Sequence, residues 1–175
     1  MKYGKRRYGA AVLGLTMLVL SLVCVVGVEA AAQPPSTLAH KTPIAFEFTN
    51  IPIDGAFDRA WTTKGNIFHG RGWDHYGDVW GDIEGTHTYD GDINLNMDTF
   101  DGAGGGTFCV TFEYAGLSGT FEGRMVFRVD GGYITGMFIC HGDDDFDGMH
   151  FKGTFEGSMF VGVYSADAVI INPHA

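Results

Sequence analysis

Apolar and polar side chains alternate with a period of two along most of the chain beyond Ala45. Turns rich in Gly or Asp interrupt this alternation at intervals of roughly eight to twelve residues, a spacing typical of all-β sandwiches and barrels. In residues 149–159, the clearest case, Met, Phe and Gly alternate with His, Lys, Thr, Glu and Ser. Such a strand has one face in the core and one in water. No segment keeps a helical period over about ten residues, so the pattern predicts an all-β domain.

Short connections between the expected strands make sequential strands antiparallel neighbours. We expect turns at Asp90-Gly91, Asp101-Gly102 and Asp130-Gly131-Gly132, where Gly supplies a positive φ, and a glycine-rich hairpin loop at 102–106. The expected strands are 45–51, 66–73, 79–89, 93–97, 107–114, 120–129, 133–141, 149–159 and 164–171. Eight or nine strands are enough to close a barrel. The predicted fold is therefore a single antiparallel, eight-stranded (eight to nine) up-and-down β-barrel over residues 45–175.

The interior of this barrel is expected to be aromatic. All 14 phenylalanines lie beyond residue 32. Gly123 and Gly157 follow Phe121 and Phe155 by two residues, on the same face of their strands. Glycine weakens a strand unless it relieves crowding or makes a bend, so we expect these glycines to make room for large rings.

The N-terminus has the layout of an export signal. Basic residues come first, an apolar run follows from Gly9 to Val28, and small residues stand at 30–32. A positive end, an apolar middle and an A-x-A site predict a secretory signal peptide over residues 1–32. The alternative is a retained membrane anchor, because about 20 apolar residues also span a bilayer as a helix. Residues 33–44 are expected to be a flexible linker, and the protein is expected to be secreted or on the cell surface.

Charge restricts the partners of the exported part. Removal of residues 1–32 leaves seven basic and 20 acidic residues, a net charge of −13. An acidic surface repels phosphate backbones and anionic lipid. We therefore expect neither nucleic acid as a partner nor membrane contact of the barrel itself, and the aromatic interior favours a small apolar ligand.

Several glycine-aromatic segments carry a family resemblance. Residues 119–124, 136–138, 141–142, 146–149 and 153–157 resemble the strand repeats of uncharacterised prokaryotic secreted proteins related to the allene oxide cyclase barrel. The resemblance implies an eight-stranded calycin-like barrel and, by analogy, a cofactor-free isomerase or cyclase acting in the cavity. No cofactor is expected on this basis. None of that family's active-site positions can be placed on this chain, and a fold does not by itself give a function.

Three side chains of the expected strand 79–89 are the catalytic candidates for the barrel interior. His87 shares a strand face with Ile83 and Tyr89. Together with Glu84, His87 and Tyr89 are the polar groups that an enzyme of this kind would use as acid and base. A hydrogen-bonded core histidine is the simpler interpretation.

Ionisable and aromatic residues cluster in residues 69–76, as they would at the mouth of a ligand-binding barrel. His69, Arg71 and Trp73 are the ligand-binding candidates. Arg71 is placed to hold a carboxylate of a ligand, or to form a surface ion pair with Asp74 or Glu84. Exposed ion pairs are common and weak, so the surface pair is the simpler alternative.

An acidic run at 143–148 resembles the first half of a calcium loop. Asp143, Asp145 and Asp147 alternate before Gly148, as in D-x-D-x-D-G. The twelfth position is Thr154 rather than Glu, so the motif is incomplete. A calcium ion is one interpretation, and a solvated acidic turn is the other.

The two cysteines beyond residue 32 are expected to be free, semi-buried thiols. A meander places the strand 120–129 between those of Cys109 and Cys140, which separates them by about 9.6 Å. A disulfide needs Cα atoms within about 7 Å.

Together these features indicate an extracytoplasmic binding or surface module without chemistry of its own. The alternatives are the cofactor-free isomerase and a calcium-stabilised structural domain. Barrel edges that can pair are compatible with a homo-oligomer.

Overall fold

The computed structural model describes residues 38, 40–52 and 57–175. The expected signal or anchor helix, and residues 33–37 and 39 of the expected linker, lie outside these residues. The expected linker boundary at residue 44 is wrong, because the first strand already begins at Lys41. Within the described ranges, no helix combines the length and hydropathy needed to cross a bilayer.

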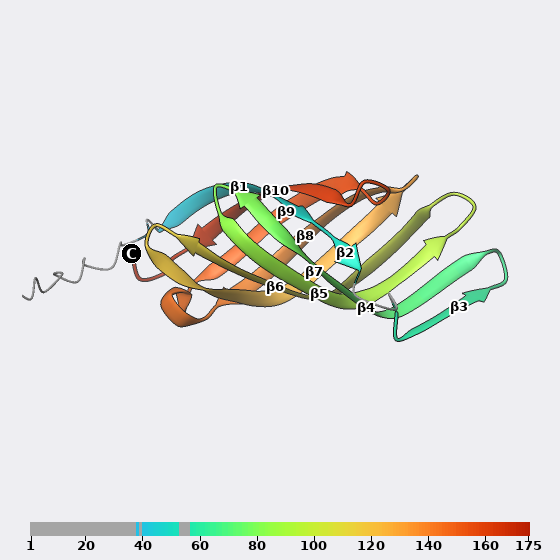
Figure 1. Cartoon of the computed structure of the whole chain (residues 1–175), viewed down its shortest axis with the longest axis horizontal. Helices are drawn as coiled ribbons and strands as arrows, with labels where there is room; N and C mark the ends of the chain where they lie inside the picture. Colours follow the sequence, from blue (N-terminus) through green and yellow to red (C-terminus); the bar gives the residue numbers. More distant parts are fainter. Residues whose placement is uncertain (1–37, 39, 53–56) are drawn as a thin grey trace, which may run out of the picture. The chain divides into compact units, whose positions relative to one another are not determined.

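Eight antiparallel strands close into an up-and-down barrel, as the alternation predicts (Figure 1). Strand β1 pairs with β10 over its whole length and with β4 through residues 46–48, and these two pairings close the sheet. Every other barrel strand pairs with its neighbour in sequence. The barrel strands are β1 (Lys41–Thr49), β4 (Ile67–Gly81), β5 (Glu84–Asn96), β6 (Asp101–Tyr114), β7 (Leu117–Asp130), β8 (Tyr133–Gly142), β9 (His150–Ser158) and β10 (Val163–Ile171).

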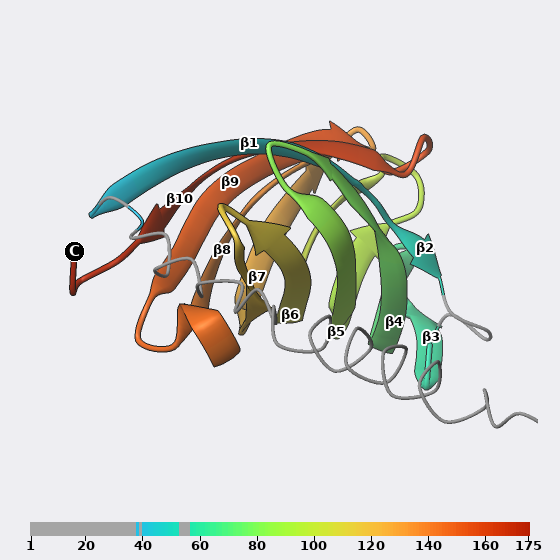
Figure 2. The same ribbon diagram turned by 60° about the vertical axis from the view of Figure 1, so that its left-hand side comes forward.

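Three short elements lie outside the eight-stranded ring. Strands β2 (Ile51–Pro52) and β3 (Arg59–Thr63) both pair with β4. Figure 1 shows β3 and the first part of β4 as a hairpin that projects beyond the barrel strands. A short 3₁₀ helix, η1 (Asp144–Phe146), connects β8 to β9 and lies at one end of the barrel (Figure 2).

Two expected strand boundaries are wrong. The expected break between residues 73 and 79 is absent, because β4 runs continuously from Ile67 to Gly81. The chain turns instead at Asp82 and Ile83, inside the expected strand 79–89. The expected turn at Asp90-Gly91 lies in the middle of β5. A Cβ on Gly91 would lie 2.1 Å from the hydroxyl of Tyr89, so this glycine serves close packing rather than a turn.

The expected turn at Asp101-Gly102 and the expected hairpin loop at 102–106 are also wrong, because the chain turns earlier, at residues 97–100. Residues 102–106 form the first part of β6 and pair with both β5 and β7. The turn at 131–132 is confirmed, with φ of +56° and +84°.

A Cβ on Gly104 would lie 2.3 Å from the ring of Phe127. Gly104 thus makes room for a ring, whereas Gly102 and Gly106 lie against backbone carbonyl groups of β5. The expected ring-relieving role is wrong for Gly123, where a Cβ would meet the backbone of Ile139 and Cys140.

Phenylalanines fill the barrel at the end near η1. Phe146 of η1 is fully buried and packs against the stacked rings of Phe112 and Phe121, with ring centroids 5.3 and 4.8 Å away. Phe151 packs 5.2 Å from Phe121 and 5.1 Å from Phe138. The predicted aromatic core is confirmed.

The two described cysteines are free, as expected. Strand β7 lies between β6 and β8. Cys140 is inside the barrel, where burial raises its thiol pKa to about 12. Cys109 lies half-buried beside the inward-facing Phe108 and Val110, so it points to the opposite face of the sheet.

Candidate functional site

Polar side chains gather inside the barrel at the end away from η1. His75 on β4 and His87 and Tyr89 on β5 are 3%, 2% and 4% exposed. His75 pairs with Tyr89 across the two strands, and His87 pairs with Gly77. Asn50, directly after β1, adds an amide to the same region. This is the only part of the described barrel core where buried side-chain N and O atoms lack partners.

A small cavity of about 20 Å³ lies beside Asn50, His87 and Tyr89. It is large enough for a water molecule, which needs roughly 10–15 Å³ by this measure. Most of its wall is aromatic. The lining residues are Phe48, Asn50, Trp73, His87, Tyr89, Met125, Phe127, Ile134, Phe155 and Tyr164.

The orientation of His87 is fixed by the backbone of β1. Its Nε2 hydrogen-bonds the carbonyl oxygen of Thr49. A carbonyl only accepts, so Nε2 carries the proton and Nδ1 is an acceptor. Nδ1 is buried and has no partner among the described residues. Burial lowers the pKa of His87, against the opposing effects of the Thr49 hydrogen bond and Asp78, so the ring is neutral at pH 7.

Gly77 makes this arrangement possible. A Cβ at this position would lie 1.9 Å from the Thr49 carbonyl oxygen and 2.7 Å from Nε2 of His87. The close approach of β1 and β4 that closes the barrel therefore requires a glycine here.

His75 has no hydrogen-bond partner at either ring nitrogen among the described residues. Its ring meets the face of Trp73 edge-on, with centroids 4.1 Å apart. Burial, and to a smaller extent the charge of His87, lowers the pKa of His75 to about 4. His75 is therefore neutral at pH 7 and offers one N–H donor and one acceptor.

Tyr89 supplies a hydroxyl that is also without a partner. Burial, followed by the charges of Asp92 and Asp90, raises the pKa of Tyr89. The phenol therefore stays protonated, and it can donate as well as accept a hydrogen bond.

A β-bulge in β4 separates the three expected ligand-binding residues. The register with β5 shifts between Gly70 and Trp73, and such a shift turns later side chains to the other face. Trp73 contacts His75 and lines the cavity. His69 and Arg71 instead lie beside Trp61 of β3, outside the cavity.

Arg71 is held by its neighbours on β4 and β5. Its guanidinium donates to the carbonyl oxygen of Gly70 and to the side-chain oxygen of Asn94, and it pairs with Asp92 at 3.4 Å. The ion pair expected between Arg71 and Asp74 or Glu84 is therefore wrong, because the carboxylate that pairs with Arg71 is that of Asp92.

Glu84 is exposed at the start of β5, so its expected position in the interior is wrong. The turn at Asp82 and Ile83 puts Glu84 on the outward face, opposite to its strand neighbours Ile83 and Gly85. His87 and Tyr89 are the catalytic candidates that the barrel does enclose.

The acidic run does not converge on one point. Asp143 caps η1 by accepting from the amide of Asp144 at 2.9 Å, and Asp145 accepts from the amide of Ser118 at 2.9 Å. In the described part of the chain, no three His, Cys, Asp or Glu side chains are grouped to hold a metal ion. Asp147 is exposed.

His75 and Asn50 are site residues that the sequence interpretation did not place. Once β4 is one strand, His75 shares the inward parity of Trp73, Gly77 and Val79. The signal was present, but the expected break at 73–79 concealed it.

Comparison with known proteins supports the fold. No family model and no curated protein matches the sequence. The crystal structure of a protein of unknown function from the DUF3224 family of Shewanella oneidensis matches with a TM-score of 0.54 and 13% identity, over 76% of this chain and 97% of that one. At this identity the likeness concerns the barrel alone. The expected relation to allene oxide cyclase is not found among these matches.

Proposed function

We propose that the protein is a binding module for a small uncharged molecule, which enters the barrel at the end that holds His75, His87 and Tyr89. The observation that carries the proposal is the set of five buried polar atoms without partners, which belong to these three residues and Asn50. Buried polar groups are nearly always hydrogen-bonded, and each unsatisfied one costs about 1–3 kcal/mol. A ligand that supplies the missing partners recovers this cost.

One water molecule is a poor substitute for such a ligand. A water in the cavity makes about three hydrogen bonds, and it leaves the two ring nitrogens of His75 without partners, because His75 is not among the residues that line the cavity. Asn50, His87 and Tyr89 carry three of the five atoms and line the cavity from β5 and the end of β1, whereas His75 of β4 lies beside Trp73, which also lines it.

The polar atoms define the chemistry of the ligand. His87 Nδ1 needs a donor, and the Tyr89 hydroxyl needs an acceptor. Both groups are uncharged at pH 7, and Phe48, Phe127 and Phe155 form apolar walls. A hydroxyl group on an aromatic or apolar body meets all these conditions, because it both donates and accepts.

Trp73 is the side chain that moves when such a molecule enters the barrel. It is half-buried, and it stacks on Phe57 with centroids 5.3 Å apart. The cavity of about 20 Å³ is smaller than an aromatic ring requires, so binding moves Trp73 away from His75.

Binding is favoured over the cofactor-free isomerase because none of the residues that the structure describes around the cavity is an Asp or Glu. A histidine that acts as a base is commonly oriented by a carboxylate, and the Nε2 of His87 is instead used by the Thr49 carbonyl.

The test is thermal unfolding of the full chain with phenol, and with benzene as a control of similar shape. At about ten times its Kd, phenol stabilises the native state by about 1.4 kcal/mol, a rise of roughly 3–6 °C in Tm. Tyr89→Phe abolishes the rise, whereas Tyr76→Phe, at an exposed tyrosine of β4, preserves it. Equal shifts with phenol and benzene, or no shift together with no small molecule released from the purified protein on denaturation, contradict the proposal.

A further inference from the structure

The outer face of strands β7 to β10 carries a groove of about 590 Å³ with exposed apolar side chains. Val126 and Met137, which line it, are 47% and 52% exposed, and the adjacent Ile139 is 55% exposed. Large exposed apolar patches on soluble domains mark interaction sites. We call this surface the β8 groove, because β8 runs along its middle.

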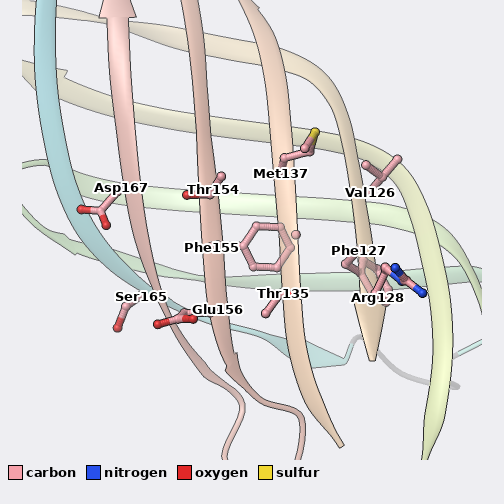
Figure 3. A pocket seen from close by; sticks show the side chains of 11 residues that line it. Val126, Phe127, Arg128, Thr135, Met137, Thr154, Phe155, Glu156, Ser165 and Asp167 are labelled. Carbon is pink, nitrogen blue, oxygen red and sulfur yellow. The ribbon is translucent and has the colours of Figure 1, made fainter. Parts of the chain in front are cut away.

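Charge is distributed unequally on the two sides of the β8 groove. Arg128 of β7 and Glu156 of β9 both pair with Thr135 of β8, so they lie on opposite sides of that strand about 9.6 Å apart. Asp167 of β10 lies further along on the acidic side. Figure 3 shows Arg128 on one side of the groove, Glu156 and Asp167 on the other, and Met137 and Thr135 between them.

This arrangement is self-complementary. A two-fold axis along the outer face of β8 places β7 of one copy over β9 of another, and β8 over β8. Arg128 of each copy then faces Glu156 of the other, while Met137 meets its own counterpart. In an isologous interface each such contact occurs twice. Arg128 forms no ion pair with a described residue of its own chain, so its charge is available to a partner.

We infer that the β8 groove is the interface of a two-fold dimer of this chain. The apolar centre on β7 and β8 is buried between the two copies, and the two pairs of Arg128 and Glu156 fix their register. Electrostatic complementarity of this kind gives specificity more than raw affinity.

One contact in this dimer is unfavourable and provides a sharp test. Arg124 of β7 and Lys152 of β9 both pair with Ile139, one row beyond the groove. The same axis brings Arg124 of one copy toward Lys152 of the other. Lys152→Glu turns this repulsion into attraction, so this variant forms a tighter dimer than the parent chain.

The experiment is sedimentation equilibrium of the full chain, in a mild detergent because the sequence from Gly9 to Val28 is apolar. The parent chain is expected to form dimers. Arg128→Glu and Glu156→Arg each raise the dissociation constant about tenfold, because each creates two repulsive contacts. The double exchange restores the parent value, and Lys152→Glu lowers it.

Two controls carry matched charge changes away from the groove. Lys64→Glu in the β3–β4 turn and Glu113→Arg on β6 alter exposed residues and leave the dissociation constant unchanged. A chain that stays monomeric to about 100 µM, an assembly larger than a dimer, or a double exchange that fails to restore binding each overturns the inference.

Discussion

The two ends of the barrel interior are built differently, although the same strands form both. At the end near η1, Phe112, Phe121, Phe146 and Phe151 are packed ring against ring, and η1 covers them. At the other end, His75, His87 and Tyr89 have polar atoms without partners among the described residues, and a small cavity lies beside His87 and Tyr89. One end is thus close-packed and apolar, whereas the other contains a cavity and buried polar atoms without hydrogen-bond partners.

This difference indicates where stability and function reside. Close packing of buried rings supplies hydrophobic and dispersion energy, so the η1 end holds the barrel together. Unsatisfied buried polar groups destabilise a fold and cluster at functional sites in natural proteins. The polar end therefore costs stability that the phenylalanine end provides.

The largest expected effect comes from truncating one ring at each end. Phe121→Ala removes a fully buried ring that contacts Phe112, Phe146 and Phe151, and lowers the free energy of unfolding by about 3–5 kcal/mol. Phe127→Ala, beside the cavity, costs at least about 1 kcal/mol less, because fewer atoms pack against it. Urea unfolding of both variants measures the difference. Equal losses would contradict the contrast between the two ends.

Most of the fold could be predicted from the sequence, because alternation with a period of two reports the face of each strand directly. The errors fall at glycines, because a glycine in the sequence can either form a turn or make room for a neighbouring side chain within a strand. Gly91 and Gly104 resemble turn glycines in sequence, but each makes room for an aromatic ring on a neighbouring position. Local sequence cannot show this role for Gly104, because the ring of Phe127 comes from the more distant strand β7. For Gly91 the ring is that of Tyr89, two residues earlier in the same strand.

The candidate site could be predicted only in part. His87 and Tyr89 follow from strand parity. Trp73 was expected together with His69 and Arg71, but the β4 bulge separates them. A bulge shifts parity by one residue, and here it includes Gly72 with a φ of +59°. Asn50 reaches the site only because β1 closes the barrel against β4.

Acid is expected to destabilise the polar end through His75. Its pKa is about 4 in the folded protein and 6.5 without the fold, so the unfolded chain binds the proton first as pH falls. The stabilisation is complete above pH 6.5 and is lost as pH falls toward 4, by about 3 kcal/mol at pH 4. Urea unfolding at pH 7 and pH 4 measures this loss.

Carboxylates also titrate in this range, so the comparison needs variants. His75→Phe removes the contribution and flattens the fall in stability between pH 7 and pH 4. His141→Gln, at an exposed histidine of β8, keeps the full fall. If the free energy of unfolding falls equally between pH 7 and pH 4 in the parent chain, His75→Phe and His141→Gln, His75 is not the group responsible.

The smallest expected effect concerns the acidic loop that holds η1 over the phenylalanine end. Asp145 accepts a hydrogen bond from the amide of Ser118, which ties the loop to the start of β7. Asp145→Ala removes this bond and lowers the free energy of unfolding by about 1 kcal/mol, equally with calcium and with EDTA. Asp147→Ala, at an exposed carboxylate of the same loop, is the control and leaves stability unchanged. A calcium-dependent rise in Tm that Asp145→Ala abolishes would instead make the loop a metal site, and the η1 end would then depend on an ion as well as on its rings.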